Sequence, residues 1–102
     1  MKIVAVTSCA TGIAHSYMAA ESLRKAGKEL GDTIKVEVQG AMGIENRLSE
    51  DEIAEADFVI WAVDVGVREK DRFDEKKVFQ FGPNEIICNA KKILAGVKEK
   101  VL

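Results

Sequence analysis

The feature that most constrains the fold is an alternation of short apolar runs with segments of helical periodicity. Residues 2–7 (Lys-Ile-Val-Ala-Val-Thr) are apolar on both faces, which is typical of a central strand in a parallel sheet. Residues 13–30 follow, with apolar side chains at spacings of four, three and four that predict an amphipathic helix. This stripe consists of Ala19, Leu23, Ala26 and Leu30. Because a strand buried on both faces needs cover on both sides, the pattern indicates an α/β domain.

Three further segments continue the alternation. Residues 33–39 (Thr-Ile-Lys-Val-Glu-Val-Gln) alternate apolar and polar side chains, which predicts a second strand with one wetter face, at the edge of the sheet. Residues 58–63 predict a third, buried strand, and residues 78–81 a short fourth strand. We interpret residues 40–43 as a loop and residues 64–77 as an irregular, charged crossover.

Capping signals and periodicity predict two more helices. Ser49 and Glu52 have the capping-box spacing, which indicates a short helix over about residues 50–55. Residues 82–84 (Gly-Pro-Asn) open the last helix, because proline is favoured in a first helical turn. The apolar stripe predicted for this last helix consists of Ile86, Ala90, Ile93, Val97 and Val101.

The predicted element order is β-α-β-α-β-β-α. Strands that alternate with helices favour parallel pairing and right-handed crossovers. We therefore predict a four-stranded parallel open sheet with strand order 2-1-3-4 and helices on both faces, a flavodoxin- or Rossmann-like three-layer sandwich. The length of 102 residues suits one hydrophobic core, so we expect a single domain over residues 1–102.

Composition excludes several classes of protein. The hydrophobic fraction of 47% and the net charge of −2 argue against an intrinsically disordered chain. The slightly acidic balance argues against nucleic acid as a partner, because nucleic-acid-binding domains carry a basic excess. We find neither an apolar run of about 18–20 residues, which a membrane span would need, nor a signal peptide, and we expect a cytoplasmic protein. Cys9 and Cys88 are far apart in sequence and are expected to be free thiols in a reducing compartment.

The loop after the first strand is the best candidate site. In open α/β sheets, ligands bind beyond the carboxyl ends of the strands at the switch point, where this loop should lie. It contains Cys9, Gly12 and the start of a helix, and helix N-termini bind anions and lower cysteine pKa values. We therefore interpret Cys9 as a nucleophile whose covalent adduct carries an anion, most plausibly phosphate; the simpler alternative is a small buried residue. Cys88, within the last helix, is interpreted as structural.

Several chemistries remain open at this loop. Low-molecular-weight tyrosine phosphatases have Cys-x₅-Arg here, whereas this chain has His15 in place of the arginine, which favours relay of a phosphoryl group over its hydrolysis. A small cysteine-dependent phosphatase or arsenate-reductase-like enzyme is the main alternative, and Asp64 or Asp71 would then approach as the acid. An anion-sensing binding domain is a third interpretation; a response regulator phosphorylated on Asp64 is disfavoured.

His15 is either a proton carrier or a residue that forms a hydrogen bond to the loop. One histidine and two distant cysteines give no metal-ligand cluster, and no cofactor is expected.

Longer motifs resemble a known family. They are residues 5–21 (Ala-Val-Thr-Ser-Cys-Ala-Thr-Gly-Ile-Ala-His-Ser-Tyr-Met-Ala-Ala-Glu), residues 36–40 with 43–46, residues 56–60, and Arg72-Phe73. The chain resembles the fructose-type IIB component of the bacterial phosphoenolpyruvate-dependent sugar phosphotransferase system from residue 2 to the last helix. The resemblance implies the same four-stranded parallel fold.

The resemblance also implies a function. Cys9 would accept a phosphoryl group from a phosphohistidine of a IIA protein or domain and pass it to fructose, or a fructose-like sugar, in the IIC membrane permease. The chain would then be a protein-Nπ-phosphohistidine–D-fructose phosphotransferase with a phosphocysteine intermediate. It would remain cytoplasmic or associate peripherally with the permease. By position, the phosphate-binding loop consists of Ala10, Thr11, Gly12, Ile13, Ala14, His15 and Ser16.

Two positions depart from the common family pattern. Ala10 replaces a usual proline, which loosens the loop and adds a main-chain N–H donor, and Ser16 replaces threonine but keeps the hydroxyl.

A IIA partner must reach Cys9, so we expect the surrounding surface to be an interface. Arg68, Lys70 and Arg72 are candidates to meet acidic groups of that partner.

Overall fold

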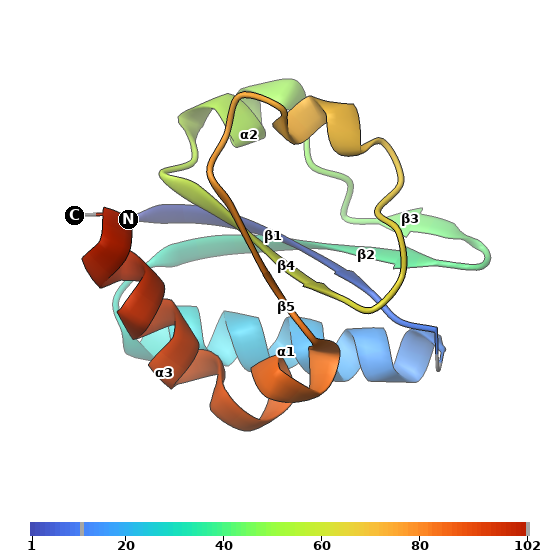
Figure 1. Ribbon diagram of the computed structural model, residues 1–102, viewed down its shortest axis with the longest axis horizontal. Coiled ribbons are helices and arrows are strands. Elements are labelled where there is room, and N and C mark those ends of the chain that lie inside the picture. Colours follow the sequence, from blue (N-terminus) through green and yellow to red (C-terminus); the bar gives the residue numbers. More distant parts are fainter. Residues whose placement is uncertain (11, 102) are drawn as a thin grey trace.

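The computed structural model describes residues 1–10 and 12–101 (Figure 1). The elements follow the predicted alternation, with one additional short strand and one 3₁₀ helix. They are β1 (Lys2–Ser8), α1 (Ile13–Glu29), β2 (Thr33–Gly40), β3 (Gly43–Glu45), α2 (Glu50–Glu55), β4 (Phe58–Val63), η1 (Lys70–Phe73), β5 (Val78–Phe81) and α3 (Pro83–Val101).

The strands form one sheet in the order β3-β2-β1-β4-β5. The parallel part, β2-β1-β4-β5, has the predicted 2-1-3-4 order, which is confirmed. The additional strand β3 pairs antiparallel with β2 through a tight hairpin, so the sheet has five strands and β2 is not at its edge. The loop predicted over residues 40–43 is therefore only the turn of this hairpin, and a three-residue strand is too short to give a periodic signal in the sequence.

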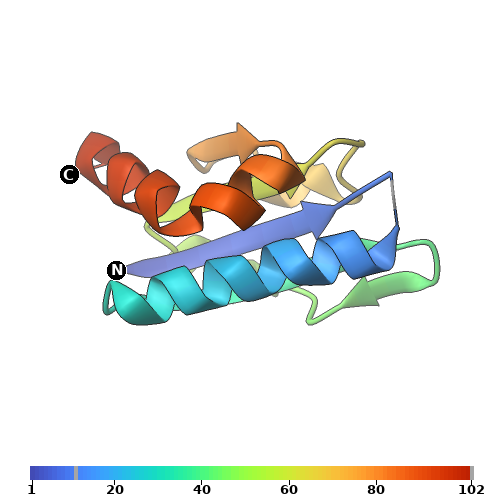
Figure 2. The same ribbon diagram turned by 90° about the horizontal axis from the view of Figure 1, so that it is seen from below.

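Helices cover both faces of the sheet, as predicted. In Figure 1, α1 and α3 lie on one face, while α2 and the segment of η1 lie on the other; Figure 2 shows α1 running alongside β1. The α1/α3 face is apolar and includes Ala19, Ala20 and Leu23 of α1, which are fully buried against the sheet. The α2/η1 face has a smaller apolar cluster, which consists of Val4, Val6, Leu48, Ile53, Ala56, Val59 and Phe73.

The C-terminal helix differs from its predicted stripe. Asn89 has φ −136° and ψ 27°, which are not helical values and kink α3. Ile86, Ala90 and Val97 of the predicted stripe are buried, whereas Ile93 and Val101 are only partly buried and pack against the same core. The difference from the prediction is Leu94, which is fully buried but was not part of the predicted stripe.

The polar face of β2 is also different from the prediction. Glu37 and Gln39 are buried, although alternation predicted a wetter face. Arg72 of η1 donates to both carboxylate oxygens of Glu37, at 2.9 and 2.8 Å, and the Leu48 N–H donates to the same group at 2.9 Å. The polar face is thus covered by the crossover after β4, and the partner role considered for Arg72 is replaced by a structural one. Although burial alone raises the pKa of the Glu37 carboxyl, these donors hold that pKa below its ordinary value.

Candidate functional site

The candidate site lies where β1, the central parallel strand, ends between its neighbours β2 and β4. Cys9 follows β1 directly, and Gly12 is the N-cap of α1. Gly12 has φ 124°, a conformation that favours glycine, and its N–H donates to the Cys9 carbonyl at 3.3 Å. The glycine therefore turns the chain from the strand into the helix and leaves the cysteine at the carboxyl end of the sheet.

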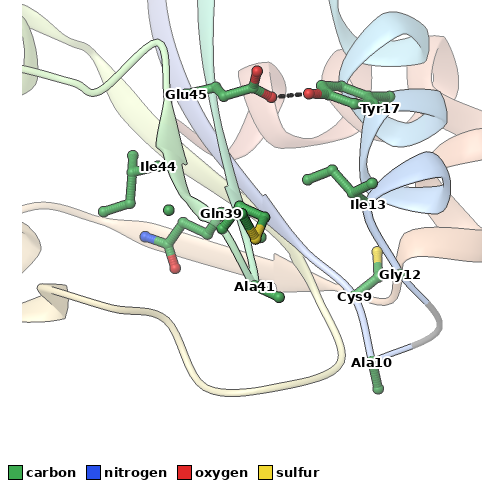
Figure 3. Close-up of a pocket in the computed structure, with 12 residues that line it drawn as sticks. Cys9, Ala10, Gly12, Ile13, Tyr17, Gln39, Ala41, Ile44 and Glu45 are labelled. Carbon is green, nitrogen blue, oxygen red and sulfur yellow. Dashed lines mark hydrogen bonds between the residues drawn. The ribbon is translucent and has the colours of Figure 1, made fainter.

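A cavity of about 520 Å³ opens beside Cys9. Figure 3 shows Cys9 and the start of α1 on one side of this cavity and the β2–β3 hairpin on the other. Tyr17 and Glu45 close one end through a hydrogen bond that the tyrosine hydroxyl donates to the carboxylate. The lining residues are Cys9, Ala10, Gly12, Ile13, Tyr17, Gln39, Gly40, Ala41, Met42, Gly43, Ile44 and Glu45.

The wall opposite Cys9 depends on Gly40. A Cβ atom at this position would lie 2.5 Å from Cδ1 of Ile13, so a larger residue here would require the end of the isoleucine side chain to move. Gln39 fixes the same wall, because its side-chain amide accepts from the Arg68 N–H at 2.8 Å and donates to the Arg68 carbonyl at 3.0 Å. Met42 at the hairpin turn is fully exposed at the rim of the cavity.

The Cys9 thiol is half-buried, and its environment favours the protonated form. Burial raises the pKa of the thiol, the Ser16 hydroxyl acts in the opposite direction, and the negative charge of Asp64 raises the pKa again. The net result is a raised pKa, so the predicted lowering is wrong for this unphosphorylated site. The main reason is the partial burial of the Cys9 thiol, to which the nearby Asp64 carboxylate adds.

Asp64 contributes more to this loop than the sequence suggested. It follows β4 and its Oδ1 accepts a hydrogen bond from the Ala10 N–H at 2.7 Å. The expectation that Ala10 adds a main-chain donor is confirmed, but in this structure the donor binds a carboxylate. From its sequence position, Asp64 was a candidate only as an acid or a phosphoryl acceptor; the parallel register of β1 and β4 brings it to the loop.

Ser16 and His15, in the first turns of α1, have different surroundings. Ser16 is buried, and its hydroxyl has no hydrogen-bond partner of ordinary geometry among the described residues, although it influences the Cys9 thiol. His15 Nε2 lies 2.8 Å from Oδ1 of Asn84 at the start of α3, so the partner seen in the structure is on another helix and not in the loop. No local pattern predicts Asn84 as this partner.

Three further predictions concern single residues. Thr11, part of the predicted phosphate loop, lies outside the described residues, whereas Ala14 is exposed on the first turn of α1. Cys88 is on α3, away from the cavity as expected, but it is exposed and therefore has no structural role in the core. Within residues 1–10 and 12–101, no group of three or more histidine, cysteine or acidic side chains could hold a metal ion. Among these same residues, no helix is long and apolar enough to cross a membrane.

Comparison with known proteins gives the class of this domain. The fold is an α/β sheet with a cysteine loop at the carboxyl end of its central parallel strand. Residues 4–96 of the chain match the family model described as "PTS system, Lactose/Cellobiose specific IIB subunit". The chain therefore belongs to the IIB family of the sugar phosphotransferase system (PTS).

The relatives within this family carry fructose names. The chain is 54% identical over 94 residues to the "PTS system fructose-specific EIIB component" of Haloferax volcanii, covering 92% of this chain and 59% of that protein. It is 47% identical to the "Fructose-like PTS system EIIBC component" of Escherichia coli, covering 93% of this chain but only 20% of the larger protein. The solution structure of an Enzyme IIB subunit from Escherichia coli K12 matches with a TM-score of 0.93 and 38% identity, over 98% of this chain and 93% of that one. The resemblance to fructose-type IIB components is thus confirmed.

Proposed function

We propose that this chain relays a phosphoryl group during sugar uptake, with Cys9 as the residue that carries it. The observation that supports this most is the position of Cys9, which is at the carboxyl end of the central strand, beside an open cavity and the first turn of α1. This is where α/β sheets bind ligands, and it is the part of the chain in which the family motif is longest. A IIA protein or domain is the proposed donor, and a sugar in the IIC permease is the proposed acceptor.

The first transfer exchanges a P–N bond for a P–S bond. The Cys9 sulfur attacks the phosphorus of a IIA phosphohistidine in line, the P–N bond breaks, and the thiol proton leaves to the released imidazole or to water. Because the pKa of the thiol is raised, it keeps its proton until the donor arrives. In the second transfer a sugar hydroxyl attacks the same phosphorus, the P–S bond breaks, and the hydroxyl proton passes to the leaving sulfur or to water.

Main-chain donors and a helix dipole are proposed to hold the phosphoryl group. Within the predicted phosphate loop, the first residues of α1 offer N–H groups at a helix N-terminus, which carries partial positive charge, whereas the Ala10 N–H is bound to Asp64. The buried hydroxyl of Ser16 acts on the Cys9 thiol and is a further proposed donor. Without an arginine at position 15 there is no bidentate clamp for a hydrolytic transition state, which favours relay.

The proposed sugar is fructose or a fructose-like sugar. The support for it is the printed names of the relatives, one of which joins its IIB part to a IIC part in one protein. We therefore place this chain on the cytoplasmic side of a IIC permease, in peripheral contact with it. The exposed apolar side chains around Cys9, such as Ile13, Tyr17 and Met42, are the proposed contact surface for these partners.

The test is phosphorylation of the purified chain with phosphoenolpyruvate, enzyme I, HPr and a fructose-type IIA protein. Intact-mass measurement and peptide mapping should find one added phosphoryl group on the Cys9 peptide, and none when IIA is omitted. Cys9→Ser should abolish the adduct, whereas Cys88→Ser, its matched control on the exposed side of α3, should keep it. A wild-type protein that stays unmodified with a competent IIA would overturn the relay; turnover of an aryl phosphate would then point to a cysteine phosphatase.

A further inference from the structure

Asp64 forms two hydrogen bonds that bracket Cys9. Its main-chain N–H donates to the Ser8 carbonyl at 3.2 Å, and its side-chain Oδ1 accepts from the Ala10 N–H at 2.7 Å. Ser8 and Ala10 are the residues immediately before and after Cys9. A single residue of the loop after β4 therefore holds the main chain on both sides of the sulfur.

The topology explains why Asp64 reaches this position. β1 and β4 are adjacent parallel strands, and Ser8 pairs with Val63, so the residue after Val63 arrives at the level of Cys9. The side-chain bond also needs an N–H at position 10, which a proline there would lack. The pair of Asp64 and Ala10 is thus a property of this chain's own residues.

We propose that Asp64 is a positioning residue for phosphoryl transfer, which holds Cys9 and its loop in place through the Ala10 N–H. The role of Asp64 in transfer rests on the proposed function. The positioning of Cys9 is a property of the unphosphorylated protein, so it can be tested without any phosphoryl donor. The carboxylate also opposes ionisation of the thiol, in agreement with the raised pKa of Cys9. Asp64 is exposed, so water weakens this second effect.

The first experiment separates the charge of Asp64 from its hydrogen bond. Alkylation of Cys9 by iodoacetamide is measured against pH in a Cys88→Ser background, which removes the other exposed thiol. Asp64→Asn and Asp64→Ala should both raise the rate at pH 7, by no more than about threefold, because Asp64 is exposed and its charge is the smallest of the causes that shift the pKa of the thiol. Asp71→Asn, in the same crossover and equally exposed, is the matched control and should leave the profile unchanged.

The second experiment concerns the hydrogen bond. Amide exchange of Ala10, followed by NMR, should become several-fold faster in Asp64→Ala but much less so in Asp64→Asn, since asparagine keeps an acceptor oxygen. Ala10→Pro removes the donor, so the difference in alkylation rate between Asp64→Asn and Asp64→Ala, two variants of equal charge, should fall to less than half on a logarithmic scale in that background. Such coupling is expected only if the two residues act through one bond.

The outcomes separate this proposal from the relay. If Asp64→Ala leaves both the alkylation profile of Cys9 and the exchange of Ala10 unchanged, the positioning role is overturned whatever Cys9 does in transfer. If both change as expected, positioning is supported even where no phosphocysteine forms. Where the relay holds, a several-fold slower transfer from IIA to Asp64→Ala, with less loss in Asp64→Asn, completes the support; equal rates in all three proteins would contradict it.

Discussion

The two faces of the sheet are closed in different ways. On the face covered by α1 and α3, fifteen buried apolar residues form one continuous core. On the face covered by α2 and η1, the apolar cluster has seven residues, and a buried ion pair between Glu37 and Arg72 lies beside it. The first face is closed mainly by apolar packing, whereas the second also depends on a buried polar network that includes Gln39 and the N–H of Leu48.

This difference has a consequence for the candidate site. Gln39 belongs to the polar network and also lines the cavity beside Cys9. The network therefore fixes the strand from which the β2–β3 hairpin extends, and with it the wall opposite the sulfur. The apolar face, by contrast, supports α1 and so determines where the first helical turn lies. The polar network thus positions one side of the cavity, and apolar packing positions the other.

The largest expected effect comes from breaking the buried ion pair. Arg72→Met leaves Glu37 charged and unpaired at a fully buried position, which should lower the free energy of unfolding by about 3–5 kcal/mol. Urea unfolding at pH 7 measures this, with the exposed Arg68→Met as control. Adding Glu37→Gln to Arg72→Met should recover part of the loss, and a double variant that is less stable by the full sum would contradict the pairing.

A comparable test on the apolar face uses the kink of α3. Leu94→Ala should lower the free energy of unfolding by about 2–5 kcal/mol, because it opens a cavity at a fully buried position. Ile93→Ala, its neighbour and matched control, is only partly buried and should cost less than half as much. Urea unfolding of both variants shows which of the two neighbours contributes more to the packing of α3; a larger loss at Ile93 would favour the stripe predicted from sequence, which lacks Leu94.

The smallest expected effect is a pH dependence confined to the polar face. The folded-state pKa of Glu37 is lowered, so its stabilisation is present above the unfolded pKa of about 4.3 and is lost as pH falls through the folded value. The stability difference between wild type and Glu37→Gln should therefore shrink on acidification, by about 1.4 kcal/mol for each unit of lowering. Urea midpoints at several pH values between 7 and 3 measure it. A constant difference would show that the carboxylate charge is not what stabilises this face.

Local patterns predicted most of the fold. Residues 58–63 and 78–81 are strands with the predicted bounds, and the capping box of Ser49 and Glu52 is present, with the Glu52 N–H donating to the serine hydroxyl at 3.1 Å. Periodicity gave the wrong burial where a contact between distant parts of the chain covers a polar side chain. Glu37 appeared solvent-facing because its sequence neighbours do not reveal that Arg72 packs over it from 35 residues away.

The candidate site shows the same division. Gly12 and the start of α1 follow from local signals, since glycine and small residues mark the turn. The cavity depends on the β2–β3 hairpin and on Gly40, and the environment of Cys9 depends on Asp64, which only the strand register brings close. The direction of the pKa shift of Cys9 was therefore the property hardest to predict from sequence. Partial burial and one nearby carboxylate raise this pKa, whereas a lowered value was expected.

The close approach of Gly40 to Ile13 has a consequence for how this site varies among homologous chains. Because a Cβ at residue 40 would meet the isoleucine Cδ1 at 2.5 Å, the two positions share one small volume. A lineage that acquires alanine or serine at position 40 must turn the end of the Ile13 side chain away or shorten it, and a lineage that shortens position 13 gains freedom at position 40. The two positions should therefore co-vary, and the pair Gly40–Ile13 should mark those homologues whose cavity beside the cysteine has the shape described above.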